Sequence, residues 1–179
     1  MKIKNLNPNE IITTKDFPVH NEHILKIYFK ICKHGNTKIL PPTPVVPLSV
    51  GLPLLVEKTK SDKEYNKRIK DYIKKHKNVK YIMCDGSHKT TALTLTHNKI
   101  HSVILKSDLD MAEVRELVKL GDVFSMNTGK TIKAELKEKA EHLKDADFFE
   151  TVLDKTKRMV KEKVIPDFMI KYYKEKVKK

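Results

Sequence analysis

Apolar residues recur at intervals of three and four along much of the chain, a spacing that is typical of amphipathic helices. Four such segments predict helices over residues 23–34, 61–77, 88–97 and 111–120. A glycine directly follows the first and the last of these segments, where helices commonly end. From residue 132 onward the pattern is again helical, and Pro166 separates the last two predicted helices.

Short apolar runs between these segments have the length of β-strands. They lie at residues 44–50, 52–57, 79–84 and 100–106, and the opening segment to about Asn21 is expected to be extended or turning. Strands that alternate with helices favour an α/β (α+β) fold with a small mixed sheet and flanking helices. We expect one domain over residues 1–131, followed by a helical C-terminal extension over residues 132–179.

The length and charge of the chain bear on its partners. Its 179 residues are enough for one domain with its own core. The formal net charge of +14 favours a polyanionic partner such as DNA, RNA or a nucleotide phosphate. The basic residues are 34 Lys and only 3 Arg, however, and Lys-rich composition also occurs in heat-adapted proteins without such a partner. The charge alone leaves both interpretations open.

No segment predicts secretion or insertion into a membrane. The chain leads from Met1 straight into polar sequence, without the pattern of a signal peptide. The longest apolar stretch, residues 39–56, contains five prolines and cannot form a spanning helix. Two cysteines, Cys32 and Cys84, are too few for a disulfide framework or a zinc site. We therefore expect a cytoplasmic protein with no membrane partner.

A tight turn between the predicted strand 79–84 and the predicted helix 88–97 has the pattern of an anion site. Its residues are Asp85, Gly86, Ser87, His88, Lys89 and Thr90. Free N–H groups at a helix start favour negative charge, and glycine lets the backbone approach a phosphate closely. The hydroxyl, imidazole and ammonium groups would add donors, and the carboxylate of Asp85 could hold a metal-bound water. Alternatively, Asp85 and Ser87 only cap the helix.

Residues 81–93 (YIMCDGSHKTTAL) resemble the strand–turn–helix signature of the ParB/sulfiredoxin superfamily, in which Asp-Gly, a variable residue, His and Arg open a helix. The resemblance extends over about residues 5–106 and implies a ParB/sulfiredoxin-like fold that binds a nucleotide through the turn residues. Lys89 stands where the family usually has Arg, so a point charge replaces a bidentate fork. The nucleophilic cysteine of sulfiredoxin corresponds to Ser87, and its chemistry is not expected here.

Two further segments are similar to the free serine kinases of this superfamily, which phosphorylate free serine from a nucleotide. Residues 17–23 resemble the stretch that supplies their catalytic carboxylate, which implies this role for Glu22, with His88 at the transferring phosphoryl group. Residues 113–131 resemble the segment that grips the substrate, which implies that Thr128 and Lys130 bind the carboxylate of L-serine. The resemblance also implies ATP or ADP as donor, with CTP as a further candidate, and Mg²⁺ at Asp85.

Each of these assignments has a structural alternative. Glu22 also fits an ordinary acid in the first turn of a helix, where the helix dipole favours it. Asp16 is a neighbouring candidate for the catalytic carboxylate, and Thr131 also fits a cap of the next helix. The loop differs enough from the kinases that the substrate could be another small hydroxyl compound.

Two other classes of function stay open. A ParB-like DNA-binding protein would use the basic surface, for example the Lys-rich helix predicted at residues 61–77. Residues 132–179 contain 14 basic and 10 acidic residues and no glycine turn between two short helices, which does not favour a helix-turn-helix. A module that only binds a protein partner would have no affinity for nucleotides.

Overall fold

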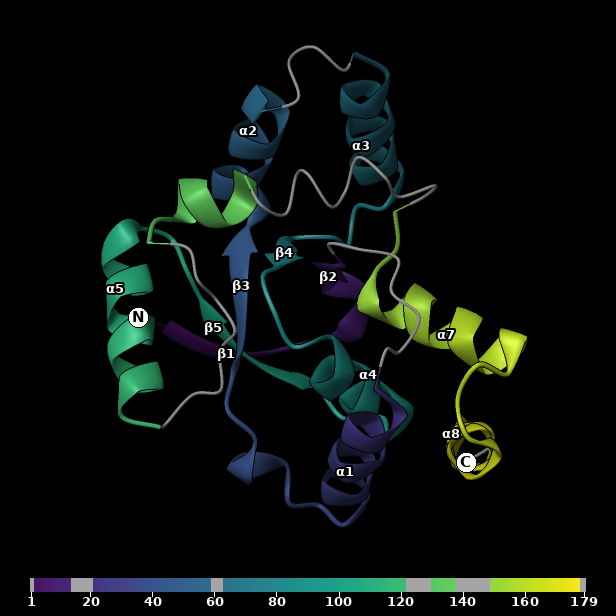
Figure 1. The fold of residues 1–179 in the computed structure, drawn as a ribbon. Coiled ribbons are helices and arrows are strands. Elements are labelled where there is room, and N and C mark those ends of the chain that lie inside the picture. The colour runs from purple at the N-terminus through teal and green to yellow at the C-terminus, as the bar shows by residue number, and fades with distance from the viewer. Residues whose placement is uncertain (1, 14–20, 59–62, 122–129, 138–148, 178–179) are drawn as a thin grey trace.

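The computed structural model describes residues 2–13, 21–58, 63–121, 130–137 and 149–177. Five strands form one mixed sheet, and helices pack on both of its faces (Figure 1). The strands are β1 (Lys2–Leu6), β2 (Ile11–Ile12), β3 (Thr43–Pro47), β4 (Tyr81–Met83) and β5 (Ile100–Ile104). The helices are α1 (Glu22–Lys33), α2 (Leu48–Lys58), α3 (Lys63–Lys75), α4 (Ser87–Leu95), α5 (Asp108–Lys119), α7 (Val152–Glu162) and α8 (Asp167–Val177), and residues 132–137 are also helical.

The order of the strands is β1-β5-β3-β4-β2, so strands that are distant in the sequence become neighbours. β3 pairs antiparallel with β4 and parallel with β5, while the edge strands β1 and β2 pair antiparallel with β5 and parallel with β4. Because β3 and β4 are antiparallel, the turn that follows β4 lies beside the beginning of β3. The backbone N–H of Cys84 accordingly donates to the carbonyl of Pro44 at 3.0 Å. The predicted α/β class with a mixed sheet is confirmed.

Successive residues of the central strands face opposite sides of the sheet, as the two-residue period of a strand requires. Val45, Met83 and Ile104 belong to a first core, which α1, α4, α7 and α8 complete. Their neighbours in the sequence belong to a second core with α2, α3, α5 and residues 132–137; these neighbours are Val46, Ile82 and Val103. The sheet therefore separates two hydrophobic cores.

Most of the predicted elements are present with ends shifted by a few residues, but the strand predicted at residues 52–57 is wrong. Those residues belong to α2, whose buried Gly51 and Leu55 face the sheet while Pro53 is exposed. A Cβ atom on Gly51 would stand 2.7 Å from Cδ1 of Ile82, so the glycine lets α2 approach β4 closely. Packing of this face outweighs the helix-breaking tendency of proline. None of the described helices is long and apolar enough to cross a membrane.

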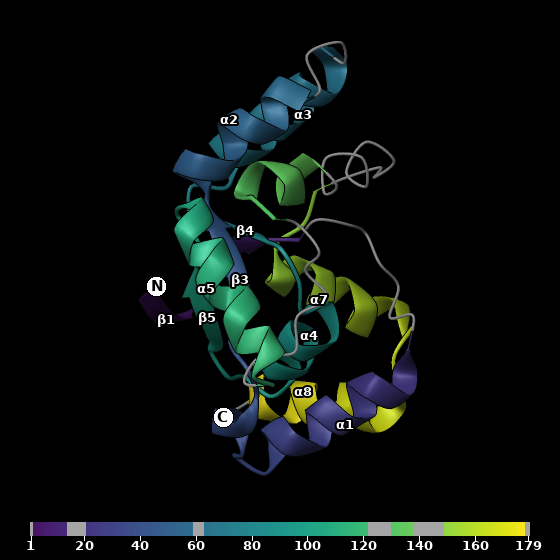
Figure 2. The same ribbon diagram turned by 60° about the vertical axis from the view of Figure 1, so that its left-hand side comes forward.

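The helices α7 and α8 pack into the first core together with α1 and α4. Val152, Met159 and Met169 are at most 1% exposed. The ring of Phe29 on α1 meets those of Phe168 and Tyr172 edge-on, at centroid distances of 5.7 and 5.5 Å, and Figure 2 shows α1 and α8 side by side. The expected boundary at residue 131 therefore does not separate two hydrophobic cores.

Replacing Met159 by Ala should destabilise the whole fold and not only α7. Met159 is fully buried in the first core, so the cavity should lower the free energy of unfolding by about 2–5 kcal/mol. The exposed Lys161→Ala on the same helix should change it by less than about 0.5 kcal/mol. Urea unfolding followed by circular dichroism measures both values. An early, separate transition of the two last helices would contradict a shared core.

Candidate functional site

The turn after β4 leaves the start of α4 without a side-chain cap. Gly86 occupies the N-cap position with φ +102°, in the left-handed region that favours glycine, and it has no side chain to cap the helix. Other helices of the protein begin differently: Asn21, Ser107 and Thr151 each accept a backbone N–H of α1, α5 or α7. The first amide groups of α4 therefore lack the oxygen that a capping side chain would supply.

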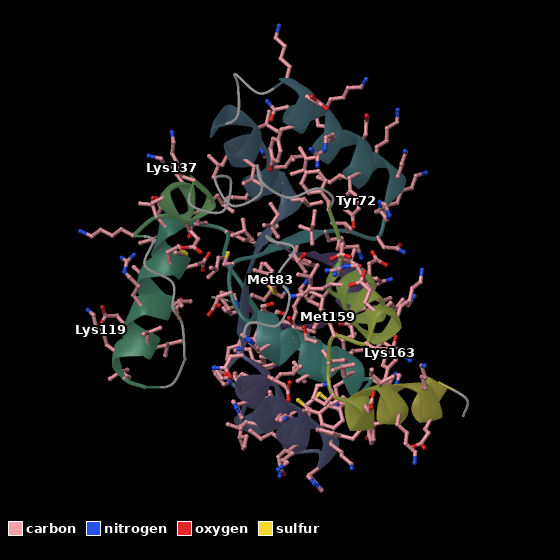
Figure 3. All side chains as sticks on the ribbon, turned by 45° about the vertical axis from the view of Figure 1, so that its right-hand side comes forward. Tyr72, Met83, Lys119, Lys137, Met159 and Lys163 are labelled. Atoms are coloured by element: carbon pink, nitrogen blue, oxygen red, sulfur yellow. The ribbon has the colours of Figure 1, made fainter. Side chains whose placement is uncertain are left out.

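A lysine from another helix reaches this helix start. Nζ of Lys155 on α7 lies 2.5 Å from Oγ of Ser87, the first residue of α4. Lysines of this protein commonly project into solvent, as Lys119, Lys137 and Lys163 do in Figure 3. Lys155 is only 1% exposed, so its amine is held in the protein interior beside the uncapped helix end.

The position of Lys155 follows from the way that α7 is anchored. The backbone N–H of Thr13, next to β2, donates to the carbonyl of Glu150 at 2.9 Å. The carboxylate of Glu150 accepts two hydrogen bonds from Arg158, at 2.7 and 3.0 Å, one helical turn beyond Lys155. Val152 and Met159 are buried in the first core on the face that also carries Lys155. These contacts direct the lysine at α4.

A buried hydroxyl group also faces the turn. Thr43, at the beginning of β3, is fully buried, and its Oγ1 has no hydrogen-bond partner among the described residues. This oxygen lies 3.4 Å from the place where a Cβ atom on Gly86 would stand. Buried polar groups are nearly always hydrogen-bonded. An oxygen or donor that binds at the turn would satisfy the threonine.

The amine of Lys89 binds main-chain carbonyls of the segment before β3. Its Nζ donates to the carbonyls of Pro41 and Pro42, at 2.6 and 3.3 Å, and the residue is 5% exposed. Burial lowers the pKa of Lys89 from 10.5 to about 8, and the negative charge of Asp85 opposes this shift. The ammonium is thus engaged by two main-chain carbonyls, and it is Lys155 that brings an amine to the helix start.

The shifted pKa of Lys89 should make stability depend on pH. Between pH 8 and 10.5 the unfolded chain binds more protons than the folded protein, so stability rises with pH. From about pH 7.5 to 9.5 the unfolding free energy of the wild type should gain about 1–2 kcal/mol relative to Lys89→Met. Urea unfolding of both proteins at several pH values measures this difference. A difference that stays constant over this range would contradict the shift.

The threonine of the turn has a structural role. Oγ1 of Thr90 donates to the carbonyls of Gly86 and Ser87, at 2.9 and 3.2 Å, and lies 3.6 Å from Sδ of Met83. The residue is 1% exposed. Its hydroxyl therefore fastens the first turn of α4, and the expectation that Thr90 binds a phosphate through this group is not supported by the geometry.

The open side of the turn is formed by partly exposed residues, which are Asp85, Gly86, Ser87 and His88. The residue His88 is partly exposed, but its Nε2 atom is buried. Burial raises the pKa of Tyr28 on α1, and the negative charge of Asp85 raises it further, so the phenol and the carboxylate lie near each other. A ligand at the start of α4 would meet Asp85 and His88 at the surface and Lys155 below it.

Among the described residues, those expected to act in catalysis and substrate binding, Glu22 and Lys130, make no hydrogen bond or ion pair with the turn. Glu22 is exposed in the first turn of α1, and its ion pair with Lys26 lowers its pKa. Lys130 lies against α5, where its carbonyl accepts a hydrogen bond from Arg115 at 2.5 Å. The helical residues 132–137 that follow it belong to the second core, on the other face of the sheet from α4 (Figure 1).

The remaining sequence expectations concern Thr128, Asp16 and Thr131. Thr128 and Asp16 lie outside the described residues. Oγ1 of Thr131 accepts the backbone N–H of Ala134 at 3.1 Å, which confirms the alternative that this threonine caps the following helix.

Comparison with protein-family models, curated proteins and solved structures found no match for this chain. The resemblance to the ParB/sulfiredoxin superfamily therefore rests on residues 81–93 and on the order of elements around them.

Proposed function

We propose that the start of α4 binds the phosphate of a nucleotide and that the protein transfers a phosphoryl group to a small hydroxyl compound. The class of protein that this implies is a phosphotransferase similar to the free serine kinases, with L-serine as the first candidate acceptor. The proposal depends most on one observation, the approach of Lys155 to Ser87 at the uncapped end of a helix.

The donors at this place match the chemistry of a phosphate. Backbone N–H groups and the dipole of a helix start attract negative charge, and the amine of Lys155 adds a further donor beside them. Hydrogen bonds that involve a charged partner are roughly twice as strong as neutral ones. The hydroxyl groups of Ser87 and Thr43 are further polar groups close to the same turn.

Asp85 is the carboxylate of the turn that would hold Mg²⁺. Mg²⁺ is usually bound by one or two carboxylates together with substrate phosphates and water. The described residues contain no group of three or more possible metal ligands. Bound there, Mg²⁺ would neutralise charge on the transferring phosphoryl group.

The protein side of the transfer then divides among three side chains and the start of α4. Lys155 and the helix start would hold the phosphate, and His88 at the mouth of the turn would contact the transferring group. Glu22, to which the resemblance to the free serine kinases gives the role of catalytic carboxylate, would accept the proton of the acceptor hydroxyl. Lys130 is not included, because it lies against α5 on the other face of the sheet.

Binding and transfer are tested with the same preparation. The purified chain is titrated with ATP, ADP and CTP in the presence of Mg²⁺, and each is then incubated with L-serine and with related small alcohols. We expect saturable binding of at least one nucleotide and formation of O-phosphoserine. Failure of all three nucleotides to bind would overturn the proposal, whereas binding without phosphoserine would remove only serine as the acceptor.

A further inference from the structure

One end of the sheet carries a basic groove that is separate from the start of α4. The groove has a volume of about 340 Å³ and is lined by Lys2, Lys4, Lys80, Lys106 and Tyr81, together with the first residues of α2. The four lysines come from β1, from the residue before β4 and from the segment after β5. They are far apart in the sequence, and the sheet brings them together.

The pairing of the strands explains why Lys2, Lys4 and Lys106 share one face. Lys2 and Lys4 alternate with Ile3 along β1 and stand opposite Ile104 and Ser102 of β5. Lys106 follows Ile104 by two residues, so it continues the same face of the extended chain. Tyr81 stands opposite Pro47 in the pairing of β4 with β3, and both line the groove.

The groove is predominantly positive. Within the part of the chain that the structure describes, the carboxylate paired with one of these lysines is that of Glu10, whose Oε1 lies 2.8 Å from Nζ of Lys80. Lys80 nevertheless has a side chain that is 60% exposed, and Lys2, Lys4 and Lys106 are exposed as well. Several lysines with one acid among them attract a polyanion.

We propose that this groove binds single-stranded nucleic acid. Lysines at alternate positions of a strand are about 7 Å apart, an interval that suits successive phosphates of an extended backbone. The partly exposed ring of Tyr81 lies among them, and aromatic rings within a positive groove stack on unpaired bases. Reading of duplex DNA usually requires a helix or ribbon that enters the major groove, and these lysines lie instead on a sheet face.

This site is independent of the proposed phosphotransferase site. The groove lies at the end of the sheet where β4 begins and β3 ends, whereas α4 follows the opposite end of β4. Loss of nucleotide binding at α4 would therefore leave the groove unaffected.

The test compares two variants with the same change in net charge. Binding of a fluorescent oligothymidylate of about 16 nucleotides is measured by anisotropy over a range of salt concentrations. The groove variant is Lys2→Gln/Lys4→Gln/Lys106→Gln, which keeps the ion pair of Lys80 with Glu10. The matched control is Lys67→Gln/Lys70→Gln/Lys74→Gln, which removes three exposed lysines from α3.

For the wild type we expect a log–log salt slope of about 3, since each phosphate contact of a single strand contributes about 0.7. The groove variant should bind at least about tenfold more weakly than the wild type, with a salt slope of about 1. The affinity of the control should remain close to that of the wild type. Equal losses in both variants, tighter binding of a duplex of the same length, or no binding by the wild type would each overturn the proposal.

Discussion

Replacing Lys155 by Met should weaken nucleotide binding by about 10- to 100-fold, because a hydrogen bond to a charged partner contributes about 1.5–3 kcal/mol. Met has nearly the length of Lys and suits the buried position, since Lys155 is 1% exposed among the apolar residues of α7. Calorimetric titration of the wild type and the variant with the Mg²⁺ complex of the tightest-binding nucleotide gives the two dissociation constants.

The matched control for this variant is Lys161→Met, which removes an exposed lysine from the same helix. It changes the net charge equally and should alter the affinity by less than about twofold, since exposed charges are screened by salt and water. Thermal unfolding of each protein establishes that it is folded. Equal affinities of Lys155→Met and the wild type would show that the lysine does not contact the phosphate.

A larger effect is expected for Glu22→Gln in phosphoryl transfer. Loss of a general base typically costs about two to four orders of magnitude in turnover, and the amide of Gln cannot accept the proton. Nucleotide affinity should stay nearly unchanged, because Glu22 lies on α1 and not on the turn itself. Steady-state rates of phosphoserine formation, together with nucleotide dissociation constants, separate the two effects.

Lys26→Met provides the control for this experiment. Lys26 is the ion-pair partner of Glu22 one helical turn away, and its removal leaves the carboxylate in place. Because exposed ion pairs contribute little to stability, this variant should stay folded. Since it also retains the carboxylate of Glu22, it should keep most of the turnover. If both variants lost activity, the ion pair and not the carboxylate alone would be required. If neither lost activity, another carboxylate would have to replace Glu22 in the mechanism, with Asp16 as the next candidate.

The sequence predicted the elements around the site well, because they depend on local patterns. The apolar stripe of α1, the strand at residues 81–83 and the glycine turn before α4 are all present. In α2 the prolines suggested strand ends, and the helix forms because Gly51 can pack against Ile82. That close approach is a property of the tertiary structure and leaves no local signal.

The two lysines of the turn show why the site itself was harder to predict. Sequence position suggested Lys89, but its direction depends on the carbonyls of Pro41 and Pro42, some 48 residues away. Lys155 is 68 residues from Ser87, and only the docking of α7 brings them together. A signal for Lys155 did exist: it occupies the apolar face of α7 with Val152 and Met159, where a lysine is unusual.

The central claim is that a nucleotide phosphate binds at the start of α4. Its most direct test is the backbone amide spectrum of ¹⁵N-labelled protein during titration with the Mg²⁺ complex of ATP, ADP or CTP. We predict that the amide signals of Gly86, Ser87 and His88 shift most, and that Lys155→Met suppresses these shifts at the same nucleotide concentration. Saturable binding that shifts signals elsewhere, for example along β1 and the basic groove, and leaves the turn unchanged would contradict the claim.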